Sequence, residues 1–554
     1  MKKQKRQPLK WIFARSKKQG VKMTLLIIAN AFFSVLSVLF AFAIKEIIDS
    51  ATIHNDLTRL ISFSVAIGII VILQFVFRII MNWLTEHIRA RLVMEYREHM
   101  FSEILVKKHD KISLYHSGEL MNRLTSDVSV VADGVSTIVP TVVAAGVRLI
   151  CAVVALIVLD WIFAVAFTVA GLLVFLVITL VREKLKGLHK GVQETDGKVR
   201  SFMQECIENL LAVKVFSVNN RIEKQVDKLQ HEHYKVQMRR AGYSVTGHAT
   251  YNFIFSAGYL FALIYGGVKI LSGVLTYGSL SAILQLVNNV QVPFASLSNV
   301  LPKYYAMLAS SERLMDIEDI ENEPQGVYIS GRKVYKKMQG IIVENATFSY
   351  GNTKVLNKAN LKINKGDFIM IEGSSGAGKS TLIKLLLGIY PLDSGRIAVQ
   401  FDGEELNIGA NTRALFSYVP QGNMLFSGTI RDNVTFIKDK ATEKEIKKAL
   451  KTSCADEFID ELPDGLETFV GENGLGLSEG QVQRLAIARA LLCDAPIIVL
   501  DEATSALDEK TEKQLLDNLA ELKDVTVILI THKKAAAKIC NRRVKISAKR
   551  IIEM

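Results

Sequence analysis

The sequence predicts a polytopic α-helical membrane domain, with six transmembrane helices that have long cytoplasmic extensions, followed by an α/β P-loop NTPase domain. The 554 residues are 49% hydrophobic, and their mean hydropathy of +0.24 is unusual for a soluble globule. The long apolar runs all lie before residue 302. After residue 340, short β-rich runs alternate with helical ones, which is typical of a nucleotide-binding domain.

The net charge of +13 is divided unequally along the chain. Residues 1–339 carry 40 Lys and Arg against 26 Asp and Glu, whereas residues 340–554 carry 28 against 29. The excess positive charge therefore lies among the apolar runs, where a nucleic-acid surface would not place it. Basic cytoplasmic flanks of membrane helices explain both features. We expect a lipid bilayer as a partner and no nucleic acid.

Residues 1–22 form a basic N-terminal segment with nine Lys and Arg and no acid. This bias places the N-terminus in the cytoplasm. Within the segment, Trp11, Ile12 and Phe13 lie among basic residues, which predicts an interfacial elbow helix. Because so few residues precede the first apolar run, we expect no fused peptidase domain.

Six runs are apolar enough to span a bilayer, which takes ~20 helical residues. The runs cover residues 23–44, 60–82, 135–159, 161–181, 253–272 and 279–301. Asp160 alone separates the third run from the fourth, so they predict a tight helical hairpin. An even number of spans returns the C-terminus to the cytoplasm. We therefore expect a multi-pass protein of the cell (plasma) membrane whose ATPase domain is cytoplasmic.

The domain boundaries follow from these runs and from the change of pattern near residue 340. The transmembrane domain is expected at 23–323, a linker at 324–339 and the nucleotide-binding domain at 340–554. Residues 83–134 and 182–250 are polar connections with helical periodicity and few breakers. The membrane helices are therefore expected to continue into the cytoplasm.

A phosphate-binding loop follows the apolar strand predicted at 368–372. The segment reads GxxxxGK[ST] and leads into a helix, the context that this motif requires. Its glycines let backbone N–H groups point at one phosphate, and the helix N-terminus adds partial positive charge. Lys379 is expected to reach the β- and γ-phosphates of ATP, and the Ser380 hydroxyl to ligate Mg²⁺. The predicted ATP-binding residues of this loop are Gly373, Ser374, Ser375, Gly376, Ala377, Gly378, Lys379, Ser380 and Thr381.

Two adjacent carboxylates follow a second buried strand, predicted at 497–500. Asp501 is expected to hold Mg²⁺, partly through water. Glu502 is the expected general base for a water molecule that attacks the γ-phosphate. His532 follows another buried strand and is expected to contact the γ-phosphate as a third reactive group.

The segment Leu477-Ser478-Glu479-Gly480-Gln481 opens another helix. It resembles the LSGGQ signature of ATP-binding cassette (ABC) proteins, and residues 340–554 resemble a complete cassette. The resemblance implies that the following residues also bind ATP or act in catalysis: Tyr350 on adenine, Gln421 in the Q-loop at Mg²⁺ and the reacting water, Ser478, Gly480 and Gln481 in the signature, and Asp508 in the D-loop. It also implies that Glu472 belongs to an acidic loop of exporter-type cassettes.

Six spans before one cassette resemble the exporter-type ABC half-transporters. Residues 115–127 resemble their first intracellular coupling region, and the second is expected near 209–218. The chain departs from the family pattern at Glu479, where a glycine is usual. It also carries Asn541 near the place of the usual aspartate that follows His532.

The resemblance implies an ATP-driven transmembrane exporter that works by alternating access as a dimer. ATP would lie between the phosphate loop of one chain and the signature of the other, and hydrolysis would reset the cycle. Because one chain holds every motif, a homodimer is preferred over pairing with a related half-transporter. The substrate class stays open among peptides, lipids and amphipathic small molecules. A siderophore-type importer and a non-transporting membrane ATPase regulator are the alternatives.

Polar residues inside the predicted spans have two interpretations. Asn30, Ser34 and Ser37 share a face of the first span, and Gln285, Asn288 and Asn289 share one of the sixth, with Gln291 beside them. They either line a polar substrate pathway or hydrogen-bond neighbouring helices. Arg148 lies within the third span. Snorkelling or an acidic partner is preferred there over contact with an anionic substrate, and Arg78 is expected to snorkel.

Overall fold

The computed structural model describes residues 7–324, 330–401, 403–422, 425–471, 474 and 476–554. The chain forms two compact units. The helical unit comprises Met1–Leu105 and His116–Asp319, and the sheet unit comprises Val106–Tyr115 and Ile320–Met554. A ten-residue segment that follows the second long helix therefore belongs to the sheet unit.

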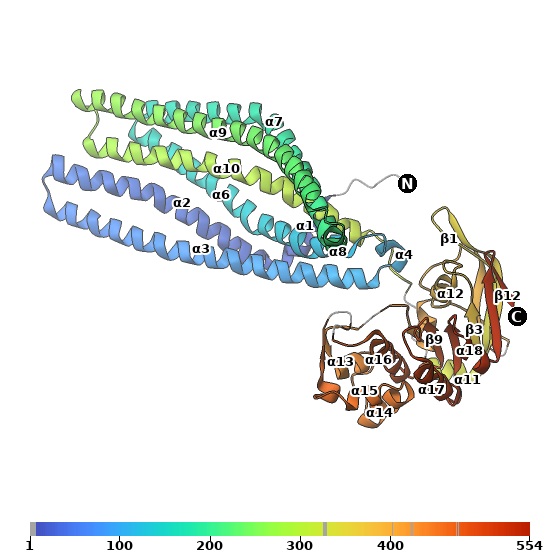
Figure 1. Cartoon of the computed structure of the whole chain (residues 1–554). Coiled ribbons are helices and arrows are strands. Elements are labelled where there is room, and N and C mark those ends of the chain that lie inside the picture. Colours follow the sequence, from blue (N-terminus) through green and yellow to red (C-terminus); the bar gives the residue numbers. More distant parts are fainter. Residues whose placement is uncertain (1–6, 325–329, 402, 423–424, 472–473, 475) are drawn as a thin grey trace. The chain divides into compact units, whose positions relative to one another are not determined.

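The helical unit is built from long helices that run alongside one another (Figure 1). Their bounds are α1 (Pro8–Ser16), α2 (Gly20–Asp49), α3 (Leu57–Val106), α5 (Ser117–Asn122), α6 (Val128–Leu159), α7 (Trp161–Glu208), α8 (Leu210–Val215), α9 (Asn219–Leu271) and α10 (Tyr277–Glu318). Apolar runs flanked by polar helical residues explain why α3, α7 and α9 are each more than twice as long as a bilayer requires.

Four of the six predicted spans coincide with helical stretches that are long and apolar enough to cross a membrane. These helical stretches are Pro8–His54, Leu57–Val106, Ser117–Leu159 and Asn219–Leu271. The fourth predicted span is described as an apolar helix only over Trp161–Leu173, which is too short alone. The sixth, at 279–301, is helical, but it is not among the stretches found apolar enough. Four amides, Gln285, Asn288, Asn289 and Gln291, lower its mean hydropathy.

The hairpin predicted around Asp160 is confirmed. Asp160 has an extended backbone between α6 and α7, and its carboxylate accepts a hydrogen bond from Ile162 N at 3.0 Å. It thereby caps the first turn of α7. Lys269 of α9 lies 3.4 Å from the same carboxylate, so the capping residue also holds a third helix.

The N-terminal helix α1 is attached to two longer helices. The ring of Trp11 stacks on that of Tyr96 in α3, with centroids 5.6 Å apart. Its indole Nε1 donates to Glu318 Oε2 at 2.8 Å, at the end of α10. A helix is thus present where the elbow was predicted.

The sheet unit contains two larger sheets. The first is antiparallel, in the order β2-β1-β4-β5, with bounds β1 (Met338–Tyr350), β2 (Thr353–Asn364), β4 (Ser394–Phe401) and β5 (Glu405–Asn407). The second has the order β12-β11-β3-β10-β9-β6, with bounds β3 (Phe368–Glu372), β6 (Phe416–Val419), β9 (Ile497–Asp501), β10 (Thr526–Ile530), β11 (Arg542–Ser547) and β12 (Arg550–Glu553). Only β12 is antiparallel to its neighbour in this second sheet. A short pair, β7 (Gly428–Thr429) and β8 (Phe469–Val470), completes the strands of the described residues.

Helices cover the parallel sheet and extend from it (Figure 1). Their bounds are α4 (His109–Ile112), α11 (Gly331–Lys337), α12 (Lys379–Leu386), α13 (Ile430–Thr435), α14 (Glu443–Thr452), α15 (Asp456–Asp460), α16 (Glu479–Leu492), α17 (Glu509–Ala520) and α18 (Lys534–Ile539). The main core lies between the two larger sheets and around α12, and it is made mostly of Ile, Leu and Val side chains. Such burial of apolar strands is typical of parallel sheets covered on both faces.

The segment predicted as a linker is partly regular. Residues 331–337 form α11, and β1 begins at Met338. Tyr335 explains the helix, because its buried ring joins the core and its hydroxyl pairs with Thr526 Oγ1 at 2.9 Å. Residues 325–329 of the predicted linker lie outside the described residues.

Candidate functional site

The predicted reactive residues lie at one edge of the parallel sheet. Strands β3, β10, β9 and β6 run parallel, so their carboxyl ends meet there. In α/β sheets, this edge is where ligands bind. The phosphate loop follows β3, Asp501 ends β9, His532 follows β10 and Gln421 follows β6.

The backbone of the phosphate loop needs its glycines. Gly376 has φ +78° and Gly378 has φ +102°, a region that other residues rarely adopt. A Cβ on Gly378 would lie 2.7 Å from Val355 Cγ1, and one on Gly373 would lie 2.8 Å from Ile546 O. Gly378 directly precedes α12, so the loop delivers free N–H groups to a helix N-terminus. Such a cradle fits a phosphate.

Lys379 lies within this cradle and is buried. Its Nζ donates to Gly373 O at 2.8 Å and to Ser374 O at 3.3 Å. His532 Nε2 lies 3.0 Å from the same Nζ, and Glu502 Oε1 lies 3.9 Å from it. The ammonium group is therefore held at the centre of the loop by carbonyl oxygens that a phosphate can replace.

Asp501 is 1% exposed, and its Oδ1 is buried without a hydrogen-bond partner among the described residues. Burial raises the pKa of this carboxyl, and the charge of neighbouring Glu502 adds to the rise. Hydrogen bonds from Ser380 and Tyr418 and the charge of Lys379 oppose it. A buried carboxylate oxygen without a donor, beside a serine hydroxyl, fits a hard cation such as Mg²⁺.

Glu502 connects the two other predicted catalytic residues. Gln421 Nε2 donates to Glu502 Oε2 at 2.7 Å, and His532 Nε2 lies 4.0 Å from Glu502 Oε1. Glu502 has φ +54°, so its side chain is presented from a strained backbone. The structure thus brings Lys379, Asp501, Glu502, Gln421 and His532 into one cluster.

The signature residues lie at the start of a different helix. Ser478 caps α16: its hydroxyl accepts from Gln481 N, and its own N–H donates to Gln481 Oε1 at 2.8 Å. A Cβ on Gly480 would lie 2.9 Å from Ala506 O, so glycine allows α16 to approach the segment after β9. Among the described residues, no contact joins Ser478 to Lys379 or Glu502. Glu472 lies outside the described residues.

Asp508 caps α17, because its carboxylate accepts from Thr511 N at 3.0 Å. These backbone and side-chain hydrogen bonds lower the pKa of Asp508. Lys533, which the sequence did not single out, donates to Thr504 O and Leu507 O, each at 2.7 Å. Its position directly after His532 was the only available signal.

Tyr418 is a second residue that sequence reasoning missed. It lies three residues before Gln421, and its hydroxyl is 3.4 Å from Asp501 Oδ2. Burial and the charge of Asp501 raise the pKa of Tyr418 strongly. The tyrosine therefore remains a neutral donor beside the carboxylate.

The predicted adenine contact Tyr350 ends β1, and 41% of the residue is exposed. Its ring meets Phe348 at 4.9 Å and Tyr390 at 5.5 Å, both edge to face. Two neighbours therefore fix the ring while part of it stays free to stack on a base.

In the helical unit, several polar residues of the predicted spans bond to helices. Asn289 of α10 is 3% exposed; its Oδ1 accepts from Arg148 Nε and Nη2 at 3.0 and 2.6 Å, and its Nδ2 donates to Ser37 O at 3.2 Å. Among the described residues, the hydrogen-bond partner of Arg148 is therefore an amide, and not the acid that was one of the two preferred interpretations. Asn30 and Ser34 donate to carbonyls of their own helix, and Ser34 also reaches Ala144 O.

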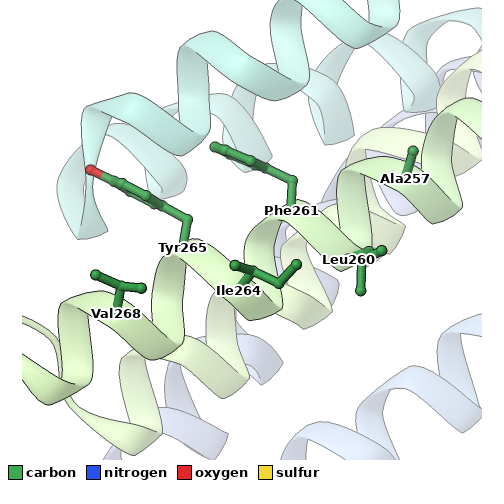
Figure 2. Close-up of a pocket in the computed structure, with 6 residues that line it drawn as sticks. All are labelled: Ala257, Leu260, Phe261, Ile264, Tyr265 and Val268. Carbon is green, nitrogen blue, oxygen red and sulfur yellow. The ribbon is translucent and has the colours of Figure 1, made fainter.

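A hollow of about 450 Å³ lies along α9. Figure 2 shows its lining on one helix: Ala257, Leu260, Phe261, Ile264, Tyr265 and Val268. These side chains recur at helical spacing and are apolar except for the tyrosine hydroxyl. Nothing in this lining suits a phosphate.

A multi-helix unit fused to a phosphate-loop sheet with this cluster defines an ATP-driven membrane transporter. Comparison with known proteins agrees: residues 23–294 match the ABC transporter transmembrane region, and residues 356–505 match the ABC transporter family. The chain is 30% identical over 533 residues to the ATP-dependent lipid A-core flippase of Desulfotalea psychrophila, across 93% of this chain and 90% of that protein. It therefore belongs to the ABC transporter family.

Other relatives agree with this assignment. The lipid A-core flippase of Escherichia coli (strain K12) is 28% identical over 497 residues, covering 88% of this chain and 84% of that protein. ABC transporter B family member 1 of Dictyostelium discoideum is 29% identical over 95% of this chain, which spans 58% of that protein. A solved bacterial Atm1-family ABC exporter with ATP bound has a TM-score of 0.82 at 22% identity, over 98% of this chain and 95% of that one. It shares the fold, a helical transmembrane unit followed by a sheet-containing ATPase.

As an ABC transporter, the chain is a multi-pass membrane protein. Its sheet unit is an ABC ATPase that binds ATP and couples its hydrolysis to transport. We call it the ATPase unit below.

Proposed function

We propose that two copies of this chain form an ATP-driven exporter that moves an amphipathic substrate by alternating access. The observation that carries the proposal is the complete cluster of Lys379, Asp501, Glu502, Gln421 and His532 within one chain. Because no reactive group is missing, the chain needs no different subunit to repair a defective site.

The phosphate loop is proposed to bind the triphosphate. Its N–H groups and the N-terminus of α12 face the phosphate oxygens, and Lys379 exchanges its carbonyl acceptors for them. Tyr350 stacks on the adenine. The other loop residues, Ser374, Ser375, Ala377 and Thr381, supply backbone and hydroxyl donors.

Ser380, Asp501 and Gln421 are proposed to hold Mg²⁺, partly through water. The bare Oδ1 of Asp501 supports this assignment. The bound ion neutralises charge on the phosphate oxygens. Tyr418 keeps the carboxylate of Asp501 oriented by donating from its hydroxyl.

Glu502 is proposed to accept a proton from the attacking water. Before reaction, Gln421 holds its carboxylate, and His532 Nε2 lies 4.0 Å from that carboxylate and 3.0 Å from Lys379 Nζ. His532 then stabilises the γ-phosphate while Gln421 orients the water. Positioned proton transfer of this kind contributes about 10²–10⁴-fold to a rate.

The signature residues are proposed to complete the site of the second copy. In support, Ser478, Gly480 and Gln481 form a capped helix start that lies outside the cluster of its own chain. Two chains placed head to tail would close ATP between the phosphate loop of one and the signature of the other, with Asp508 beside the junction. Hydrolysis then releases the two ATPase units.

The transported molecule is proposed to be amphipathic, among lipids, peptides and small molecules. The two flippases named above act on lipid A-core, which favours a lipid. The inner polar residues Asn289 and Arg148 bond to each other, which favours a structural role for them over a polar pathway. We propose that the protein lies in the plasma membrane and exports its substrate. Because residues 1–22 are basic, we place both termini and the ATPase unit in the cytoplasm.

Reconstituted vesicles test the proposal. Vesicles that hold the protein with its ATPase unit outside and carry a fluorescent phospholipid or peptide are supplied with Mg²⁺ and ATP. Glu502→Gln is expected to abolish both phosphate release and ATP-driven movement, whereas Glu509→Gln, an exposed glutamate on α17, should leave both unchanged. Movement that survives in the Glu502→Gln protein would contradict the assignment. Hydrolysis without movement of any probe would favour the non-transporting regulator.

A further inference from the structure

Two chain segments that leave the long helices pair with each other inside the ATPase unit. Residues 106–108 comprise the last residue of α3 and the two that follow it, and residues 321–323 lie shortly after α10. Glu323 N donates to Val106 O at 2.8 Å, and Lys108 N donates to Glu321 O at 3.1 Å. Lys107 and Asn322 form an antiparallel bridge, supported by a 2.7 Å bond between their side chains. We call these six residues the exit clasp.

Arg413 joins the exit clasp to the helix of the phosphate loop. It lies in the short turn before β6. On one side, its guanidinium forms a forked pair with Glu323, in which Nη1 donates at 2.8 Å and Nη2 donates to the other carboxylate oxygen. On the other side, Nε donates to Leu387 O at 3.0 Å and Nη2 donates to Gly388 O at 3.0 Å.

These two carbonyls lie at the C-terminal end of α12. The last carbonyls of a helix lack partners within the helix and carry partial negative charge. A guanidinium is planar and has five donors, so it can satisfy both carbonyls and a carboxylate in one plane. A lysine at the same place would supply one point charge and lose the fork.

A second contact reaches the same end of α12. Tyr390 follows the helix by four residues, and His109 of α4 meets its ring edge to face at 5.9 Å. Tyr390 also contacts Tyr350, the proposed adenine platform, at 5.5 Å. The segment that leaves α3 therefore contacts Tyr390, which lies between the C-terminal end of α12 and the proposed adenine platform.

We propose that Arg413 is a positioning residue that passes nucleotide-dependent movement of α12 to the exit clasp. The N-terminus of α12 faces the phosphates and its C-terminus faces Arg413, so the short helix acts as a rigid rod about 12 Å long. A shift at one end then moves Val106, the last residue of α3, and Glu323, which follows the end of α10 by five residues. The proposal rests on the ATP-binding part of the proposed function and not on substrate, direction or dimer.

Hydrogen exchange on the full chain tests this role. The protein carries Glu502→Gln to prevent hydrolysis, and exchange is compared with and without Mg²⁺ and ATP in detergent. With Arg413 present, ATP is expected to slow exchange about tenfold both at residues 373–386 and at residues 106–115. In Arg413→Gln, slowing at 373–386 remains and slowing at 106–115 disappears. Arg413→Lys should give an intermediate effect at 106–115.

Arg396→Gln is the matched control. Arg396 is also held by two carboxylates, Glu344 and Glu405, but these lie in the antiparallel sheet. The Arg396→Gln variant should keep the ATP-dependent slowing of exchange at residues 373–386 and at residues 106–115. Glu323→Gln, which removes the charge that Arg413 grips, should reproduce the loss at 106–115.

The outcomes separate this inference from the proposed function. Slowing at 106–115 that persists in Arg413→Gln overturns the role of Arg413, as does loss of slowing at 373–386 in that variant, which would mark a role in the ATP site itself. No slowing at 373–386 even with Arg413 present overturns ATP binding and the inference together. Normal exchange results without transport in vesicles would contradict the proposed function alone.

Discussion

At the scale of single residues, the phosphate loop depends on backbone conformations that its glycines permit. Gly378 combines φ +102° with a position where a Cβ would meet Val355 at 2.7 Å. The motif explains this glycine by the backbone turn that points N–H groups at a phosphate. The structure adds that the residue also lies against β2, so side-chain volume is excluded on two grounds.

We expect Gly378→Ala to weaken ATP binding at least tenfold and to lower the free energy of unfolding by about 1–3 kcal/mol, because strained φ and steric overlap act together. Binding of a fluorescent ATP analogue and thermal unfolding would measure the two effects. Gly403→Ala is the control: its φ is +83°, but no atom lies within 4 Å of the added Cβ. It should show strain without loss of ATP binding, and equal loss in both variants would contradict the prediction.

Asp501 carries a buried carboxylate whose charge opposes folding, although we propose that it holds Mg²⁺. Its pKa is raised mainly by burial, so the ionised form is less stable in the folded chain than in the unfolded one. At neutral pH the carboxylate therefore lowers the stability of the metal-free protein. As pH falls toward the raised pKa, protonation removes this penalty.

We accordingly expect Asp501→Asn to stabilise the EDTA-treated protein by about 1 kcal/mol at neutral pH, within the range found when functional sites are neutralised. The gain should shrink as pH falls, while Mg²⁺-dependent hydrolysis is lost at every pH. Thermal unfolding with and without Mg²⁺ measures both. A metal-free Asn variant that is less stable than the parent at pH 7 would refute the sign.

At the scale of elements, one side-chain network joins three helices of the membrane unit. Asn289 of α10 accepts from Arg148 of α6 and donates to Ser37 O of α2. The sequence placed polar residues on helix faces but left open whether they serve a substrate or other helices. The partners of Asn289 lie 141 and 252 positions away, and no local pattern could have paired them.

Replacement of Asn289 by Leu is expected to lower stability in detergent by about 2–3 kcal/mol, because it strands the Arg148 guanidinium among apolar helices. Arg148→Leu with Asn289→Leu should recover part of that loss. Asn30→Leu is the control, since the amide of Asn30 donates only to its own helix at Leu26 O. Thermal unfolding of the unaltered protein, the single variants Asn289→Leu and Arg148→Leu, and the double variant gives the coupling energy, and additive losses would argue against the pair.

The α10 helix shows why a hydropathy threshold alone does not select every span that the sequence predicts. Its four amides lower the apolar character of the run, yet the helix is continuous from Tyr277 to Glu318. Two of the buried polar residues on it, Asn289 and Ser310, are satisfied by partners on other helices. A hydropathy scale counts such residues as if they faced lipid, whereas burial against neighbours removes that penalty.

At the scale of the whole molecule, the proposed head-to-tail dimer predicts that each ATP site needs residues from two chains. Lys379→Ala and Ser478→Ala are each expected to abolish hydrolysis. When the two variants are co-assembled, the dimer formed from one of each has one site with an intact loop and an intact signature. Mixed dimers, isolated through a different affinity tag on each chain, should therefore hydrolyse ATP at about half the normal rate.

Phosphate release by co-purified chains with different affinity tags measures this recovery. The control pairs the unaltered chain with a chain that carries both substitutions. Each mixed dimer of this kind has no intact site, because every site then contains either the altered loop or the altered signature. Absence of recovery in the first mixture would contradict a site shared between chains.

The sequence by itself determined where the chemistry lies. A strand, a glycine loop and a helix in succession require phosphate-binding geometry, and acidic or histidine residues that follow buried strands meet at one sheet edge because parallel strands share their direction. These are consequences of local pattern. The apolar runs and the basic residues among them likewise indicated a membrane protein from the sequence alone.

Only the tertiary structure decided which distant groups meet. Arg148 donates hydrogen bonds to an amide, and Tyr418 donates one to Asp501. Arg413 bonds both to Glu323 and to a carbonyl at the end of α12. Each pair joins separate elements, and which side chains face one another depends on how these elements pack. Sequence periodicity indicates which face of an element is apolar. It does not indicate how neighbouring elements are aligned with one another, and this alignment decides which of these side chains come into contact.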